Sequence, residues 1–326
     1  MTSELALRGL VTVFGGSGFV GRHTVRALAR RGWRIRVACR RPDLAGHLQP
    51  MGRVGQIHAV QANVRNPDSV RRAVEGADAV VNLVAVLAPS GRQTFEAVHV
   101  AGARDIAKAA AGINAKQLVH ISAIGADSKS GGRYGRTKAE GERAVLDAFP
   151  GAVILRPSIV FGPEDAFFNR FAAMARIAPV MPLIGGRTRF QPVYVGDVAA
   201  AIAAACDGHA APGTIYELGG PEIFTFRKLL DRTQEWTGRS RPYLSVPFWL
   251  ASLGAMLTAP LPAGLRPLTT DQVRMLQRDN VVSEAATREA RTLQGLGIEA
   301  PHAIDSIVPG YLEQFKPKGQ YSHYRG

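Results

Sequence analysis

Three glycines near the N-terminus constrain the fold of this chain more than any other feature. They stand at positions 15, 18 and 21, directly after the β-branched run 11–14 and directly before a segment with helical periodicity (23–31). A strand that turns through glycines into a helix lets the backbone approach a pyrophosphate, which the free N–H groups of the helix N-terminus then bind. The spacing alone is weak evidence, but the strand–turn–helix context is the one that dinucleotide binding requires. The loop residues expected at the phosphates are Gly15, Ser17, Gly18, Phe19, Val20 and Gly21.

Apolar runs and amphipathic segments alternate along the first half of the chain. Strands are expected at 11–14, 34–39, 56–61, 79–84, 117–122, 153–155 and 214–218, and helices at 21–31, 67–75, 93–111, 134–149 and 198–207. Alternating strands and helices predict an α/β fold with a doubly wound, Rossmann-like parallel sheet. The nearly continuous apolar run at 79–84 is typical of a sheet covered on both faces.

The alternation becomes irregular after about residue 162, where proline- and glycine-rich segments interrupt short helices. We therefore expect a nucleotide-binding domain made of residues 1–162 and 190–220. A smaller C-terminal lobe for substrate or partner would comprise 163–189 and 221–315, and 316–326 would form an extended tail.

Composition narrows the class of protein. The formal net charge is +14, which attracts phosphate-bearing ligands, anionic lipid or an acidic protein, unless the charge is spread evenly over all faces. Nucleic acid is not expected, because no reader motif is present and aromatic residues make up only 7%. Two cysteines, Cys39 and Cys206, fit buried positions in a reducing compartment, and no metal site is expected. The chain carries neither a signal-peptide pattern nor a run of roughly 18 apolar residues, which predicts a cytoplasmic location.

The residues after the second predicted strand indicate which dinucleotide is bound. NAD-binding proteins usually place an acidic residue there for the ribose 2′-hydroxyl. Here the strand is followed by Arg40 and Arg41, and a guanidinium suits a 2′-phosphate. The alternative is two solvated arginines at a strand end. The pattern favours NADPH over NADH.

A second group of residues is typical of carbonyl chemistry. Tyr134 and Lys138 are four residues apart, on one face of a predicted helix, and Ser122 ends the strand that precedes them. An ammonium group near the phenol would lower the pKa of the phenol, and the serine hydroxyl could orient a substrate carbonyl. A Tyr-x-x-x-Lys pair is common by chance, but behind the glycine motif it predicts the catalytic group Ser122, Tyr134 and Lys138.

With these motifs together, the chain resembles the extended short-chain dehydrogenase/reductases, the NAD-dependent epimerase/dehydratase superfamily. The resemblance covers nearly the whole chain and implies cofactor contacts from Asn63, Val64, Ala85, Lys138, Pro157 and Ser158. It also implies that Asp197 caps a helix by which the chain re-enters the main domain. His99 stands where the family has an asparagine that supports proton transfer. Its imidazole would either replace that asparagine or be a hydrogen-bonded, half-buried histidine.

The segments 133–142, 148–152 and 161–169 resemble a narrower branch. That branch contains the NAD(P)H-binding accessory subunit of respiratory complex I and its bacterial relatives. The resemblance implies NADPH as a structural or regulatory ligand, complex I subunits as partners, and a peripheral place on the inner face of a bacterial membrane. The alternative is an NADP-dependent reductase, dehydrogenase or epimerase with an unidentified carbonyl or sugar-nucleotide substrate. A nucleotide-sensing redox regulator is a third class, against which the retained Tyr–Lys pair argues.

The most apolar stretch of the second lobe is 246–261, which is too short to span a membrane and contains prolines. The favoured interpretation is a core helix of the lobe. The alternative is a helix that faces a partner or an anionic membrane surface.

Overall fold

The computed structural model describes residues 8–258 and 268–317, and these divide into two compact units. The first unit comprises the residues up to 157 together with 195–218 and 283–299; the second comprises 158–194, 219–282 and the residues from 300 onward. The segment 283–299, expected in the smaller lobe, thus packs with the first unit. Its position has a local cause, since the Ser283 backbone N–H donates to the Glu217 carboxylate at 2.7 Å.

The first unit is built on a seven-stranded sheet in the order β11-β6-β5-β4-β1-β2-β3, with every neighbouring pair parallel. The predicted doubly wound α/β fold is confirmed. In the centre of the sheet, Val13 pairs with Val37 on one side and with Val81 on the other. The strands are β1 (Leu10–Phe14), β2 (Arg34–Cys39), β3 (Ile57–Gln61), β4 (Ala79–Asn82), β5 (Gln117–Ile121), β6 (Val153–Pro157) and β11 (Ile215–Leu218).

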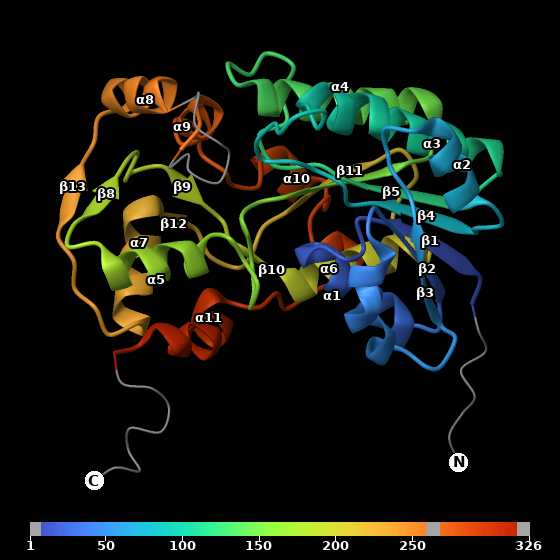
Figure 1. The fold of residues 1–326 in the computed structure, drawn as a ribbon, viewed down its shortest axis with the longest axis horizontal. Coiled ribbons are helices and arrows are strands. Elements are labelled where there is room, and N and C mark those ends of the chain that lie inside the picture. Colours follow the sequence, from blue (N-terminus) through green and yellow to red (C-terminus); the bar gives the residue numbers. More distant parts are fainter. Residues whose placement is uncertain (1–7, 259–267, 318–326) are drawn as a thin grey trace, which may run out of the picture. The chain divides into compact units, whose positions relative to one another are not determined.

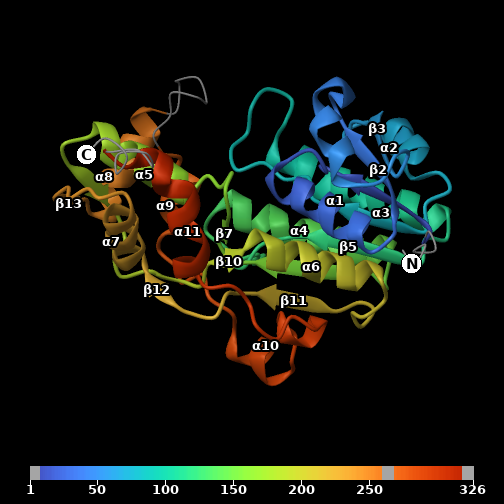
Figure 2. The same cartoon turned by 90° about the horizontal axis from the view of Figure 1, so that it is seen from below.

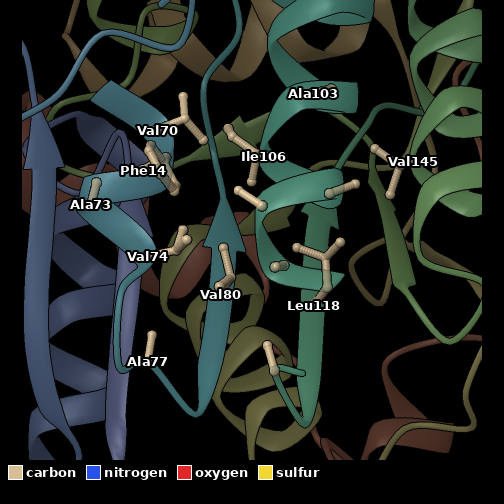
Figure 3. Close-up of a cluster of buried hydrophobic side chains, with 14 of the residues drawn as sticks. Phe14, Val70, Ala73, Val74, Ala77, Val80, Ala103, Ile106, Leu118 and Val145 are labelled. Atoms are coloured by element: carbon tan, nitrogen blue, oxygen red, sulfur yellow. The ribbon is translucent and has the colours of Figure 1, made fainter. Parts of the chain in front are cut away.

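Helices cover both faces of this sheet, which is why all four residues of β4 are buried. One face carries α1 (Phe19–Arg30) and α6 (Val195–Cys206), which lie side by side in Figure 2. The other carries α2 (Pro67–Val74), α3 (Ala103–Gly112) and α4 (Arg133–Ala148) (Figure 1). Between this second layer and the sheet, Phe14 and Leu118 of the strands pack with Val70 of α2 and Ile106 of α3 (Figure 3). A packed core of this kind holds the strand ends, and the loops after them, in fixed positions.

The structure corrects two of the helix predictions by more than a shift of the ends. The predicted helix 93–111 is divided into a π-helical turn, η2 (Glu96–Gly102), and α3. Asp197 does not cap α6: the helix begins at Val195 and places Asp197 in its first turn, where an acidic residue suits the positive end of the helix dipole. This unit also contains the short α10 (Glu284–Arg288) and two 3-10 helices, η1 (Pro42–Met51) and η4 (Gln294–Leu296).

The second unit has an aromatic core of its own. Phe161, Phe168 and Phe226 are buried in it, between α5 (Phe168–Ile177), α7 (Phe226–Trp236) and α11 (Ile304–Leu312). The Asp165 carboxylate accepts the N–H groups of Phe167 and Asn169 and so satisfies backbone donors where α5 begins. The strands form three short pairs: β7 (Val160–Phe161) with β10 (Val193–Tyr194), β8 (Met181–Leu183) with β13 (Tyr243–Ser245), and β9 (Arg189–Phe190) with β12 (Phe224–Thr225).

The apolar stretch 246–261 forms α8 (Phe248–Leu257), followed later by α9 (Thr270–Met275). The expectation of a core helix is wrong, because Ala255 is the one residue of α8 that is buried. Residues 259–261 of the stretch and 318–326 of the expected tail lie outside the described residues. Across the described ranges, no helix combines the length and the apolar character that crossing a membrane requires.

Candidate nucleotide-binding and catalytic site

The glycine loop joins β1 to α1 in the geometry that the motif predicts. Gly15 adopts a φ of +80°, a left-handed conformation that favours glycine, and its carbonyl accepts the Gly18 N–H at 3.0 Å. A Cβ atom at Gly21 would stand 2.3 Å from the Gly15 oxygen, so only glycine lets α1 start this close to the loop. The loop lies beside the segment after β4. A Cβ atom added to Gly15 would lie 3.3 Å from the Val84 side chain.

The N-terminus of α1 fits an anionic ligand. Its N-cap residue is Gly18, no side chain caps the helix, and its first turn holds no acidic residue. The first N–H groups of such a helix have no partner within the helix, and they carry the positive end of its dipole. Gly18 is exposed, with an ordinary extended conformation (φ −79°, ψ −176°). Phe19 and Val20, the next residues predicted at the phosphates, are half-buried in the first turn. The chain therefore presents backbone donors where a pyrophosphate would bind.

A polar hollow of about 320 Å³ opens where β2 and β3 end. Two cations line it, Arg40 from the end of β2 and Arg72 from α2, and neither guanidinium has a hydrogen bond or ion pair within the described ranges. The hollow also contains Asn63, one of the predicted cofactor contacts. Its remaining lining residues are Gln61, Ala62, Asn66 and Ser69.

Arg41 is placed differently from Arg40. Its guanidinium faces Asp43, with Nη2 2.9 Å from Oδ2, and both side chains are exposed. This pair raises the pKa of Arg41 and lowers that of the Asp43 carboxyl, chiefly through the side-chain hydrogen bond. An arginine already paired to a carboxylate is a poorer ligand for a phosphate. Of the two predicted arginines, Arg40 is thus the one whose guanidinium is available to bind a phosphate.

The other predicted cofactor contacts are scattered over the two units. Val64 is half-buried, and its side chain lies next to Gly102, where an added Cβ atom would be 3.2 Å away. Ala85 is exposed in the loop after β4. Pro157 ends β6 in the first unit. Ser158 begins the second unit, and its hydroxyl lies 2.7 Å from the Asn280 Oδ1 atom and 2.9 Å from the Asn280 carbonyl oxygen. The role of these residues toward a cofactor stays a prediction.

The three predicted catalytic residues are all buried in the first unit. The Lys138 Nζ atom donates to the carbonyl of Ile121 at 2.8 Å, which ties α4 to the end of β5, next to Ser122. The Ser122 Oγ atom is buried and has no hydrogen-bond partner in the described part of the chain. A buried hydroxyl left without a partner costs free energy, roughly 1–3 kcal/mol, so a ligand that accepts from it gains that amount. The residues present therefore fit a bound carbonyl or hydroxyl group.

Burial dominates the protonation of this group. It raises the pKa of Tyr134 to about 12 and lowers the pKa of Lys138 to about 8, an effect that the nearby Glu142 carboxylate opposes. The expectation that the Lys138 ammonium group lowers the pKa of the phenol is wrong for this structure, because desolvation of the phenolate raises it. At neutral pH the Tyr134 phenol keeps its proton, which suits a proton donor better than a base.

His99 is a buried, fully hydrogen-bonded histidine. Its Nε2 accepts the Val86 N–H at 3.1 Å, so in the neutral ring the proton is on Nδ1, which lies 3.2 Å from the Thr137 Oγ1 atom. Its ring stacks on Phe95 and meets the edge of Tyr134 at a centroid distance of 5.5 Å. Burial, followed by the Lys138 charge, lowers the pKa of His99 to about 3. Both ring nitrogens already have hydrogen-bond partners. This supports the interpretation of His99 as a hydrogen-bonded histidine of the interior over a replacement for the family's asparagine in proton transfer.

Close packing of α4 on η2 fixes these positions. A Cβ atom at Gly141 would lie 2.1 Å from the His99 carbonyl oxygen, so this contact also requires glycine. On α4, the buried Glu142 carboxylate receives two hydrogen bonds from Arg156, at 2.8 and 2.6 Å. A bidentate pair of this kind holds the helix against β6 with defined geometry.

Sequence reasoning missed Arg72 and Thr137. The signal for Arg72 was present: Asn66-Pro67 starts a helix directly after the third strand, and Ser69 and Arg72 share one face of it at i, i+3 spacing. Thr137 carried no comparable signal, because its contact with His99 depends on how α4 packs. No cluster of His, Cys, Asp or Glu residues that could hold a metal ion occurs in the ranges that the structure describes.

Comparison with known proteins places these features in one family. A family model described as the NAD dependent epimerase/dehydratase family matches residues 11–219. The mitochondrial NADH dehydrogenase (ubiquinone) 1 alpha subcomplex subunit 9 of Arabidopsis thaliana is 35% identical over 328 residues, covering 95% of this chain and 79% of the relative. The subunit of the same name in Rattus norvegicus is 33% identical, with 91% and 78% covered. A ceramide reductase of Caulobacter vibrioides is 33% identical over 199 residues, 61% of each chain.

Solved structures agree on the fold at lower identity. The NADPH-dependent quinone oxidoreductase QOR2 of Escherichia coli superposes with a TM-score of 0.71 at 19% identity, covering 93% of this chain and 99% of the other. A dTDP-glucose 4,6-dehydratase of Streptomyces venezuelae also gives 0.71 at 19% identity, covering 97% and 98%. The predicted resemblance is confirmed: this chain belongs to the NAD dependent epimerase/dehydratase family and is homologous to alpha subcomplex subunit 9 of respiratory complex I.

Proposed function

We propose that this protein binds NADPH as a structural or regulatory ligand and associates with respiratory complex I at the membrane. The uncapped start of α1, with the glycines that let it approach the loop, is the observation that carries nucleotide binding. The relatives named as complex I subunits, matched over nearly the whole chain, support the partner. The backbone N–H groups after Gly18 would hold the pyrophosphate, and Arg40 and Arg72 would hold the 2′-phosphate.

The preference for NADPH follows from Arg40 and Arg72. Each replacement by alanine removes a charge-assisted contact worth roughly 1.5–3 kcal/mol, which corresponds to a tenfold or larger loss of NADPH affinity. NADH lacks the 2′-phosphate, so its affinity should change little. Calorimetric titration of both nucleotides against wild type, Arg40→Ala and Arg72→Ala measures this directly.

Arg41→Ala is the matched control for that experiment. It removes the same charge one residue away, from a guanidinium that Asp43 already holds, so it should reduce NADPH affinity by less than Arg40→Ala. Equal affinity of the wild type for the two nucleotides would disprove the assignment of the hollow to a 2′-phosphate.

The complex I role is tested in the cell. A tagged copy recovered from gently solubilised membranes should carry respiratory complex I subunits with it. Release of the protein by raised salt would indicate an electrostatic component, since salt screens charges beyond about 10 Å at 0.1 M. A protein found wholly in the soluble fraction at low salt, without any respiratory subunit, would contradict this part of the proposal.

The buried and unpartnered Ser122 hydroxyl favours a second candidate function, an NADP-dependent reductase or epimerase. The relative named as a ceramide reductase supports the same direction. NADPH, when bound, supplies a hydride. The Ser122 hydroxyl would donate to a substrate carbonyl, and the Tyr134 phenol, which keeps its proton at neutral pH, would transfer it to the carbonyl oxygen.

If the protein is an enzyme, Tyr134→Phe should abolish turnover while NADPH affinity stays within about twofold, because only proton transfer is lost. Lys138→Ala should reduce both, since the family places this lysine on the nicotinamide ribose. Turnover is followed by NADPH absorbance with a panel of carbonyl and sugar-nucleotide substrates, and affinity by calorimetry. Equal turnover of wild type and Tyr134→Phe would refute the catalytic assignment.

A further inference from the structure

The second unit exposes a continuous apolar face on α8. Five residues form it, at i, i+1, i+4, i+7 and i+8 spacing, which places them on one side of the helix. We call this group the α8 surface, and its members are Trp249 (69% exposed), Leu250 (44%), Leu253 (47%), Met256 (64%) and Leu257 (73%). The helix contains no charged residue. A group of five neighbouring exposed apolar side chains indicates an interaction site.

The opposite side of α8 is packed, so the exposure of the α8 surface does not come from a detached helix. Ala255 is buried, and α9 lies beside α8 (Figure 1). The Phe248 ring contacts the turn at Gly185. A Cβ atom added to Gly185 would lie only 2.8 Å from the Phe248 Cζ atom. The helix is thus packed along one side, and its other side, the α8 surface, forms an exposed apolar ridge.

Cations lie on the two segments beside this ridge, the turn at Gly185 and α9. Arg187 follows Gly185 in the turn that the Phe248 ring contacts, and it makes no ion pair within the part of the chain that the structure describes. Arg274 and Arg278 are exposed on α9 and directly after it. Two carboxylates stand on the same segments: Asp271 in the first turn of α9, and Asp279, which Arg189 engages at 2.7 Å. The surroundings of the ridge therefore have the same positive sign as the chain's net charge of +14.

We infer that the α8 surface binds an anionic lipid bilayer, entering the boundary between headgroups and acyl chains. A tryptophan with leucine and methionine neighbours suits that depth, since the ring is apolar and its N–H can meet the headgroups. Arginines around the ridge would lie at the level of the lipid phosphates. Of the five exposed side chains, only that of Trp249 carries a hydrogen-bond donor. The inference rests on the membrane-side role proposed above and is independent of nucleotide binding.

The test uses the full-length protein and vesicles of phosphatidylcholine with or without phosphatidylglycerol. Wild type should float with the anionic vesicles, and Trp249→Ser/Leu253→Ser/Met256→Ser should lose about tenfold or more of that affinity. The matched control is Leu44→Ser/Val54→Ser/Leu87→Ser, which removes three exposed apolar side chains from the first unit and should bind as wild type does. All six side chains are exposed, so thermal melting should show both variants folded.

Trp249 provides a second readout. The chain has three tryptophans, and Trp33 is buried, so insertion of the exposed Trp249 should shift the emission to the blue and make it sensitive to brominated lipid. Trp249→Phe should remove that change.

Three results would overturn the inference. They are no binding to pure lipid at low salt, equal binding by wild type and the α8 variant, and a dimer that the α8 variant dissociates in the absence of lipid binding. The NADPH titration and the recovery of complex I subunits are read separately, so failure of this inference is distinguishable from failure of the proposed function.

Discussion

Gly18→Val should abolish NADPH binding while leaving the nucleotide-free protein folded. Gly18 is exposed, its backbone is in a conformation open to any residue, and an added Cβ would meet only the Gly15 oxygen, at 3.3 Å. A valine there would occupy the space in front of the α1 N–H groups. With NADPH at 100 times its dissociation constant, wild type gains about 2.7 kcal/mol of stability by mass action, and the variant should gain none. Thermal melting with and without NADPH measures the difference.

Gly112→Val is the control for this experiment. It adds the same side chain at the end of α3, where nothing lies within 4 Å of the new Cβ, and it should keep the full stabilisation by NADPH. Gly21→Ala should behave differently from both, since its methyl group would collide with the backbone of Gly15 and Gly16 and so destabilise the nucleotide-free protein. A Gly18→Val protein that NADPH still stabilises would refute the phosphate-loop assignment.

The protein should lose stability steeply as the pH falls below about 6.5, because two histidines are held neutral in the fold. Burial lowers the pKa of His99 to about 3 and holds the pKa of His120 well below its usual range. An unfolded chain binds protons at these residues from about pH 6.5, so between pH 6.5 and 3 the unfolded state holds more protons than the native state. The stabilising effect is complete above that window and is lost on moving down through it. For His99 alone, the free energy of unfolding should fall by about 2 kcal/mol between pH 7 and pH 5.

Urea unfolding at a series of pH values tests this. His99→Asn should make the dependence of stability on pH shallower between pH 6.5 and 4, even if the variant is less stable at pH 7. Val98→Ala, a buried neighbour in the same π-helical turn, should lower stability equally at every pH, because it removes no titrating group. An unchanged slope in His99→Asn would show that His99 takes no part in the acid response.

Local features of the sequence were sufficient to predict the sheet. The ranges 11–14 and 34–39 were placed within one residue of β1 and β2. β1 is almost wholly apolar and a glycine turn follows it, whereas β2 shows its strand character in the alternation of Arg34 and Arg36 with the apolar Ile35 and Val37. The glycine loop was predictable for the same reason, since Gly15 and Gly21 are required by backbone geometry within a few residues of chain.

The surroundings of the predicted site residues depended on packing between distant segments. Arg40 and Arg41 look alike in the sequence, and only the fold shows that Asp43 engages one while the other shares a hollow with Arg72. The direction of the Tyr134 pKa could not be predicted either, because the spacing to Lys138 does not indicate how deeply α4 buries the phenol.

The sequence by itself determined the seven strands of the parallel sheet and the position of the glycine loop, since both follow from periodicity and from glycine conformation over short stretches. The tertiary structure decided what faces solvent. Apolar residues at 248–257 predict burial, yet Trp249, Met256 and Leu257 are exposed. Whether an apolar helix is buried depends on which elements of the fold cover it, and those elements lie far away in the chain.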